Sequence, residues 1–280
     1  MISYDCHIHS SFSSDSKTDP ETQIQRAIEL GMKGICFTDH IDREFPNEER
    51  SGLSFIFDLD EYFKELLPLK EKYADRLDIR TGVEIGLRNE EECRGRISGY
   101  YKEMLAAYPF DFVIGSTHCL EFTDPYYEEP YWTGKSVQEG FRTYFEAVLY
   151  NVNNYDFDSL GHLDYLVRYV PKSKDWELGD YRVSDYLDIL DEILKRLIET
   201  GRALEVNSAG LKYGLGFAHP KHEILKRYRE LGGELITIGS DGHKPEHICY
   251  AFDEVADILK SLGFEHYAVY KLRSPQIVKL

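Results

Sequence analysis

Short apolar runs alternate with longer amphipathic stretches along the whole chain. Short apolar runs of this kind are typical of buried strands. We predict strands at residues 2–7, 34–38, 79–85, 112–117, 158–162, 203–207 and 234–239. The last apolar run, residues 267–270, is a candidate eighth strand.

The stretches between these runs have apolar residues at three- and four-residue steps, which is typical of one face of a helix. The clearest predicted helices are residues 20–30, 58–73, 184–200 and 220–231. The first and last begin with proline, which suits the first helical turn, and both end before a glycine. Pro68 is expected to kink or end its helix early.

The ends of the seven predicted strands follow one another at steps of 33 to 44 residues. This is the length of a strand plus a returning helix, and such units build parallel sheets. Six of the seven ends carry His, Asp or Glu, and these side chains converge only if the sheet closes into a barrel with one mouth. No linker interrupts the pattern, so we predict a single α/β domain over residues 1–280, built as a TIM-like barrel.

Two connections exceed the usual few residues, at 41–57 and 119–134. The second is rich in aromatic residues, including Phe122, Tyr126, Tyr131 and Trp132. Long loops in compact domains are often functional lids, and aromatic packing on the barrel rim is the alternative.

The net charge of −17 argues against sequence-independent binding of nucleic acid and against binding to anionic membranes. No apolar run approaches the roughly 18 residues of a membrane span, and no secretory signal is evident, so we expect a cytoplasmic protein. Five cysteines without C-x-x-C spacing favour buried, reduced thiols. Cys119 is the exception, because it follows His118 and is a candidate neighbour of the site.

His7 and His9 stand two residues apart at the end of the first strand, so their rings point to the same face and are able to hold one metal ion. Further histidines and acidic residues, which are also common metal ligands, recur at later strand ends. The nine candidate ligands are His7, His9, Asp15, His40, Glu84, His118, His162, Asp241 and His243. A single histidine is usually a core residue, but ionisable groups clustered at one mouth are costly without metal.

Imidazoles mixed with carboxylates suit Zn, Mn or Fe better than Ca or Mg. At three or four ligands per ion, nine side chains suit two or three divalent ions, with Glu84 or Asp241 as a bridge. Arg168 and Lys212 follow later strand ends and are the candidate cations for a small phosphorylated substrate. The histidines outside these patterns, His219, His222, His247 and His266, are expected at the surface or in loops.

Several short motifs resemble those of the PHP (polymerase and histidinol phosphatase) family. They are His7-Ile8-His9, Thr38-Asp39-His40, Gly82-Val83-Glu84, Gly115-Ser116-Thr117-His118, Gly161-His162-Leu163-Asp164 and Gly239-Ser240-Asp241-Gly242-His243. They occur in the family's order and together are highly specific. The resemblance implies a distorted (β/α)7 TIM-like barrel with a trinuclear metal centre.

The resemblance also implies how the ligands are shared among the ions. The first ion would take His7, His9, Glu84 and Asp241; the second, Glu84, His118 and His162; the third, Asp15, His40 and His243. Many relatives have histidine at the position of Asp15, which makes it the least secure ligand; the acid fits the histidinol-phosphatase branch.

The resemblance to stand-alone histidinol-phosphatases predicts a metal-dependent phosphomonoesterase acting on L-histidinol phosphate. Asp241 or His243 would give a proton to the leaving oxygen. The alternatives are a hydrolase of phosphotyrosine, a nucleotide or a phosphodiester, and a metal-binding regulatory protein without catalysis.

Overall fold

Parallel strands form the centre of the computed structural model, which describes residues 1–46, 52–127 and 129–280. The strands are β1 (Tyr4–Ile8), β2 (Gly34–Phe37), β3 (His40–Ile41), β4 (Asp78–Gly86), β5 (Phe112–Ser116), β6 (Ser159–Leu160), β7 (Ala203–Asn207) and β8 (Ile236–Gly239). They pair in the order β1-β2-β4-β5-β6-β7-β8, and β3 continues beside β4. Each of the seven predicted strands is present.

The first and last strands meet, so the sheet is nearly closed. Ile8 bridges Gly242 in parallel, and the backbone N–H of His9 donates to the Gly242 carbonyl at 3.1 Å. The buried Gln23 side chain donates to the carbonyls of both His9 and Gly242, at 2.8 and 3.0 Å. A distorted seven-stranded α/β barrel is therefore confirmed, and its seam lies directly beside the His-x-His pair.

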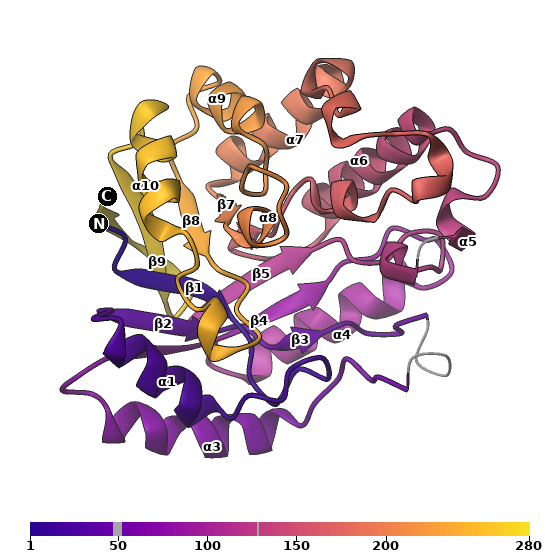
Figure 1. Cartoon of the computed structure of the whole chain (residues 1–280). Helices are drawn as coiled ribbons and strands as arrows, with labels where there is room; N and C mark the ends of the chain where they lie inside the picture. Colours follow the sequence, from indigo (N-terminus) through magenta and orange to yellow (C-terminus); the bar gives the residue numbers. More distant parts are fainter. Residues whose placement is uncertain (47–51, 128) are drawn as a thin grey trace.

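Helices cover the outside of this barrel (Figure 1). The covering helices are α1 (Pro20–Glu29), α3 (Leu59–Lys72), α4 (Arg94–Ala107), α6 (Val137–Asn154), α7 (Leu187–Thr200), α9 (His222–Glu230) and α10 (Phe252–Ser261). The short α5 (Glu129–Trp132) and α8 (Ala209–Lys212) lie in the loops after β5 and β7. The carboxylates of Asp19 and Asp58 accept backbone N–H groups at the starts of α1 and α3. The expectation that Pro68 ends its helix early was wrong. α3 runs on to Lys72 because its apolar face, which includes Tyr62 and Leu66, is held in the core.

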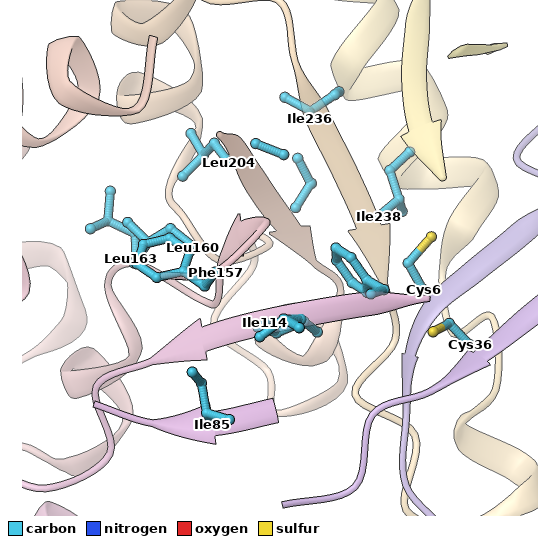
Figure 2. Close-up of a cluster of buried hydrophobic side chains, with 14 of the residues drawn as sticks. Cys6, Cys36, Ile85, Ile114, Phe157, Leu160, Leu163, Leu204, Ile236 and Ile238 are labelled. Carbon is cyan, nitrogen blue, oxygen red and sulfur yellow. The ribbon is translucent and has the colours of Figure 1, made fainter. Parts of the chain in front are cut away.

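Apolar side chains pack between neighbouring strands (Figure 2). Cys6 and Ile238, from the two strands that meet at the seam, both belong to this cluster. Along β1, Cys6 and Ile8 join the core whereas His7 turns toward the mouth, which is the expected two-residue alternation. All five cysteines are free, and all except Cys249 are fully buried, as expected for structural thiols.

A hairpin closes the end of the barrel opposite the predicted site. It consists of β9 (His266–Lys271) and β10 (Ser274–Lys279). The predicted eighth strand is β9, but it pairs only with β10, in antiparallel fashion. The Tyr270 ring stacks on Phe112 at 4.9 Å, and Arg80 donates to the Tyr270 carbonyl at 2.9 Å. These contacts lie at the amino ends of β4 and β5, away from the metal-ligand candidates.

The two long loops carry short elements that line or support the mouth. The first contains β3, and residues 47–51 of it lie outside the described part of the chain. In the second, which includes undescribed residue 128, Tyr131 and Trp132 are buried in the core while Phe122 and Tyr126 are exposed. This loop is therefore partly packed on the rim. None of the described helices is long and apolar enough to cross a membrane.

The seam predicts a stability effect at Gly239. A Cβ added there would lie 2.3 Å from the Cβ of His7 and 2.9 Å from a Glu205 carboxylate oxygen. We expect Gly239→Ala to lower the melting temperature and to weaken metal binding, because His7 must move. Gly99→Ala is the matched control: Gly99 lies within α4 with open space around it, so alanine should stabilise by about 0.5–1 kcal/mol. Thermal unfolding in which both variants behave alike would contradict the proposed packing.

Candidate metal centre and its cavity

Two imidazole nitrogens and a carboxylate meet at the mouth of the barrel. Nε2 of His7 lies 3.0 Å from Nε2 of His9 and 3.1 Å from a carboxylate oxygen of Glu84. All three side chains are fully buried. Their ligand atoms lie close enough together to bind one ion.

Hydrogen bonding on the other side of each ring shows why these nitrogens suit a cation. Nδ1 of His7 faces Glu205 at 2.5 Å, and Nδ1 of His9 faces the Ser13 hydroxyl at 2.9 Å. A proton held on Nδ1 leaves a lone pair on Nε2. Two lone pairs and the Glu84 carboxylate then face one another in a buried space, and a divalent ion removes that repulsion.

Glu84 also faces a second group of histidines. Its other carboxylate oxygen lies 2.9 Å from Nε2 of His162 and 3.2 Å from Nε2 of His118, and it accepts the Ser116 hydroxyl at 2.6 Å. Asp42 binds Nδ1 of His118 at 2.8 Å, so the free Nε2 of that ring is directed at Glu84. Glu84 therefore lies between two clusters, as a bridging ligand must.

The remaining candidates lie on the other side of His9. Asp15 is 3.1 Å from Nε2 of His243 and 3.7 Å from Nε2 of His40. Nε2 of His243 is nevertheless buried without a hydrogen bond in the described part of the chain, which fits a metal-ligand nitrogen. Asp241 lies 3.4 Å from Nε2 of His9 and 3.3 Å from Nδ1 of His243. All nine candidate ligands thus gather at this mouth.

Several buried acids that orient these ligands were not predicted to do so. Glu205 holds His7 and also accepts the backbone N–H of His162 at 2.7 Å. Asp39 accepts the Ser13 hydroxyl at 2.7 Å, and Ser13 in turn contacts His9. Both acids adjoin strand-end positions that the sequence pattern had marked. What the pattern lacked was the direction in which each carboxylate points.

One histidine outside the motifs is buried. His219 lies in the connection between α8 and α9, in keeping with the expected surface or loop position, but its side chain is fully buried and its Nδ1 lies 2.6 Å from Asp164. Asp164 also accepts the backbone N–H of Lys221 at 2.8 Å. The pair fastens the segment before α9 to the loop after β6. It is a structural contact rather than part of the metal cluster.

A cavity of about 490 Å³ opens above the cluster. Its lining includes Arg168, whose guanidinium lies 3.7 Å from the Tyr213 ring centre and 5.1 Å from that of Tyr169. No carboxylate of the described chain lies within ion-pair distance of Arg168, so its charge faces the cavity. Lys212 does not line the cavity; its ammonium donates to the Asp241 carbonyl at 2.9 Å. Lys244, which was not predicted, lines it instead.

A family model for the PHP domain matches residues 5–209. The chain belongs to the PHP domain family. The histidinol-phosphatase of Lactococcus lactis is 32% identical, over 96% of this chain and 95% of its own length. A probable histidinol-phosphatase of Clostridium acetobutylicum is 35% identical over 88% of each chain.

A solved PHP structure agrees over nearly the whole chain. It is histidinol phosphate phosphatase from Lactococcus lactis, complexed with Zn, L-histidinol and phosphate. The TM-score is 0.84 at 30% identity, and the alignment covers 98% of this chain and 99% of the other. The family expected from the motifs is confirmed.

The charges of this PHP site depend strongly on one another. Burial disfavours ionised Glu84, but His7, His40 and His118 hold its pKa well below the usual range. Burial likewise opposes protonation of His40, yet Glu84 and Asp15 raise the pKa of its ring to about 9. Burial and the neighbouring rings of His243 and His40 lower the pKa of His9. In the absence of metal, protons on some rings balance the buried carboxylates.

This balance predicts a pH-dependent effect of metal on stability. An unfolded histidine titrates near 6.5, whereas folded His40 titrates near 9. Its protonated form therefore stabilises metal-free protein fully below pH 6.5, and this contribution is lost as the pH rises to about 9. Bound ions replace that proton. We expect the melting-temperature difference between Zn-loaded and chelator-treated protein to widen from pH 6.5 to 9. A constant difference across that range would count against this coupling.

Proposed function

We propose that this chain is a metal-dependent phosphomonoesterase that hydrolyses L-histidinol phosphate to L-histidinol and phosphate, a step of histidine biosynthesis. The observation that carries the proposal is Glu84, which faces two groups of histidine nitrogens beneath a cavity lined by Arg168. In such a site, metal ions held by Glu84 and the histidines would supply positive charge at the floor of the cavity, and Arg168 would supply it from one wall. The choice of leaving group rests on the similarity to histidinol-phosphatases over nearly the full chain.

The nine residues at the mouth would hold two or three divalent ions, Zn, Mn or Fe. The buried Nε2 of His243 beside the Asp15 carboxylate and the opposed nitrogens of His7 and His9 fit such ions. When bound, the ions lower the pKa of water, so that a nucleophile forms near neutral pH, and they neutralise phosphoryl oxygens. Glu84 would be shared between two of them, because each of its oxygens faces a different set of rings.

The chain's own side chains then divide the remaining tasks. Arg168 binds two phosphoryl oxygens through its planar guanidinium, which the tyrosine rings hold in place. Asp241 or His243, which contact each other at 3.3 Å, would give a proton to the leaving oxygen. Lys212 was our second phosphate candidate, but its bond to the Asp241 carbonyl favours a supporting role. Lys244 is better placed to approach the phosphate.

Two rival functions remain distinguishable by experiment. Another phosphate ester would use the same floor and the same arginine with a different leaving group. A non-catalytic metal-binding protein would keep the cluster but would not need the cavity lined by Arg168, Asp241 and His243. The wall composition therefore favours an enzyme.

The test measures turnover of four phosphate esters by metal-loaded protein. The esters are L-histidinol phosphate, phosphotyrosine, a nucleoside monophosphate and a phosphodiester. We expect the highest kcat/KM for L-histidinol phosphate. Glu84→Gln and His118→Ala should each lower turnover by at least ~100-fold, because metal ligation is disturbed. Elemental analysis of each variant accompanies the kinetics. Near-normal turnover with full metal content would remove that residue from the ligand set, and no turnover by wild type would overturn the proposed function.

Arg168→Ala tests phosphate capture separately. Losing a charge-assisted contact of about 1.5–3 kcal/mol should lower kcat/KM roughly 10- to 150-fold. Metal content should stay unchanged, since arginine is not a ligand. Arg142→Ala on the outer helix α6 is the matched control, because Arg142 pairs with exposed Asp188 outside the site and should leave kinetics unaltered. An unaltered kcat/KM in Arg168→Ala would show that this arginine is only a charge at the rim of the cavity and does not bind the phosphate.

A further inference from the structure

The walls of the cavity carry opposite charges on neighbouring loops of the barrel mouth. The cations Arg168 and Lys244 come from the loops after β6 and β8. The carboxylates that are not candidate metal ligands, Asp42 and Asp124, come from the loops after β3 and β5, which form one arc around β4. β5 pairs directly with β6, and the rings of Tyr126 and Tyr169 on their two loops lie 5.8 Å apart, so this arc adjoins the Arg168 loop. A ligand in the cavity therefore meets a guanidinium and a carboxylate on adjoining loops.

The Asp124 carboxylate has no ion-pair partner among the described residues. Its side chain is 8% exposed and accepts the backbone N–H of Tyr126 at 2.8 Å. No arginine, lysine or histidine of the described residues lies within ion-pair distance of its carboxylate, although Arg168 lines the same cavity. Burial raises the pKa of Asp124 to about 6. The carboxylate is thus ionised at neutral pH but poorly solvated, and a cation from outside would compensate it.

A second carboxylate lines the cavity near Asp124, among the rings of His40 and His118. Asp42 lines the same arc, and its Oδ1 is buried without a hydrogen-bond partner in the described part of the chain, while Oδ2 binds His118. Beside these acids, Phe45 and Phe55 pack ring against ring at 4.6 Å and also line the cavity. This arc therefore combines two carboxylates with an apolar aromatic wall. A flat, weakly polar ring carrying a nearby cation fits that combination.

We propose that Asp124 binds the ammonium group of the substrate's leaving alcohol and thereby selects phosphate esters of amino alcohols. This inference rests on the proposed phosphatase function and adds a recognition residue to it. With the phosphate held by the floor and by Arg168, the leaving group extends to the adjoining loop after β5. L-Histidinol phosphate carries a primary amine close to its ester oxygen and an aromatic imidazole beyond. The amine then meets Asp124, and the imidazole packs on Phe45 and Phe55.

The test removes the carboxylate charge and the amine separately and together. Kinetics are measured for wild type and Asp124→Asn with L-histidinol phosphate and with its des-amino analogue, 3-(4-imidazolyl)propyl phosphate. Asparagine keeps an oxygen for the Tyr126 N–H and removes only the charge. We expect wild type to prefer the amino substrate by roughly 10- to 150-fold in kcat/KM, the range of a charge-assisted contact. In Asp124→Asn this preference should fall to near unity, with little change for the des-amino substrate.

The control is Glu121→Gln, which removes a carboxylate from the same loop. Glu121 is exposed and pairs with Lys135 outside the cavity, so the substrate preference should stay at the wild-type value. An unchanged preference in Asp124→Asn would overturn the inference while leaving the phosphatase function intact. Equal loss on both substrates would assign Asp124 a structural role and would also overturn it.

A binding measurement keeps the inference testable if the phosphatase function itself fails. Calorimetry of Zn-loaded protein with inorganic phosphate compares L-histidinol with the des-amino alcohol. Weaker binding of the des-amino alcohol to wild type, and equal binding of both to Asp124→Asn, would support the proposed contact even without turnover. Equal binding of both alcohols to wild type would overturn it.

Discussion

Glu84 is the group on which the rest of the mouth depends. A fully buried carboxylate is stable in its ionised form only if positive charge surrounds it, and here five histidine rings approach its two oxygens. Those rings come from the ends of β1, β3, β5 and β6, so one side chain on β4 joins most of the barrel circumference. Protons or divalent ions must supply the compensating charge. The fold therefore creates an electrostatic demand that metal satisfies.

The outer partners of the rings turn this demand into a defined geometry. Without Glu205 on His7, Asp42 on His118 and the Ser13–Asp39 pair on His9, each imidazole would be free to present either nitrogen. Each partner fixes one Nδ1 and leaves Nε2 for the centre. The barrel seam adds a second constraint, since the close approach of Gly239 to His7 leaves that ring little room to move. Ligand orientation is thus determined before any ion binds.

Local patterns in the sequence were sufficient for the strands and for the ligand candidates. A strand and its terminal His or Glu lie within a few residues, so alternation and spacing indicate both. Orientation and pairing depend on distant segments, which is why β9 was taken for a possible barrel strand and Lys212 for a phosphate ligand. The burial of His219 against Asp164 was missed for the same reason. The helix through Pro68 shows packing overriding a local preference.

The placement of Arg168 and Asp124 on adjoining loops has a consequence for how affinity and selectivity arise. In a chain with a net charge of −17, the overall field repels phosphate, so capture must rely on the floor of the cavity and on Arg168. That affinity should rise and fall with metal loading. Asp124 lies on the adjoining loop after β5 and is not a candidate ligand, so discrimination between leaving groups should depend little on which divalent ion is bound. The phosphate and the alcohol would thus meet different side chains of one cavity, and a change at Asp124 would alter the choice of substrate without removing a candidate metal ligand.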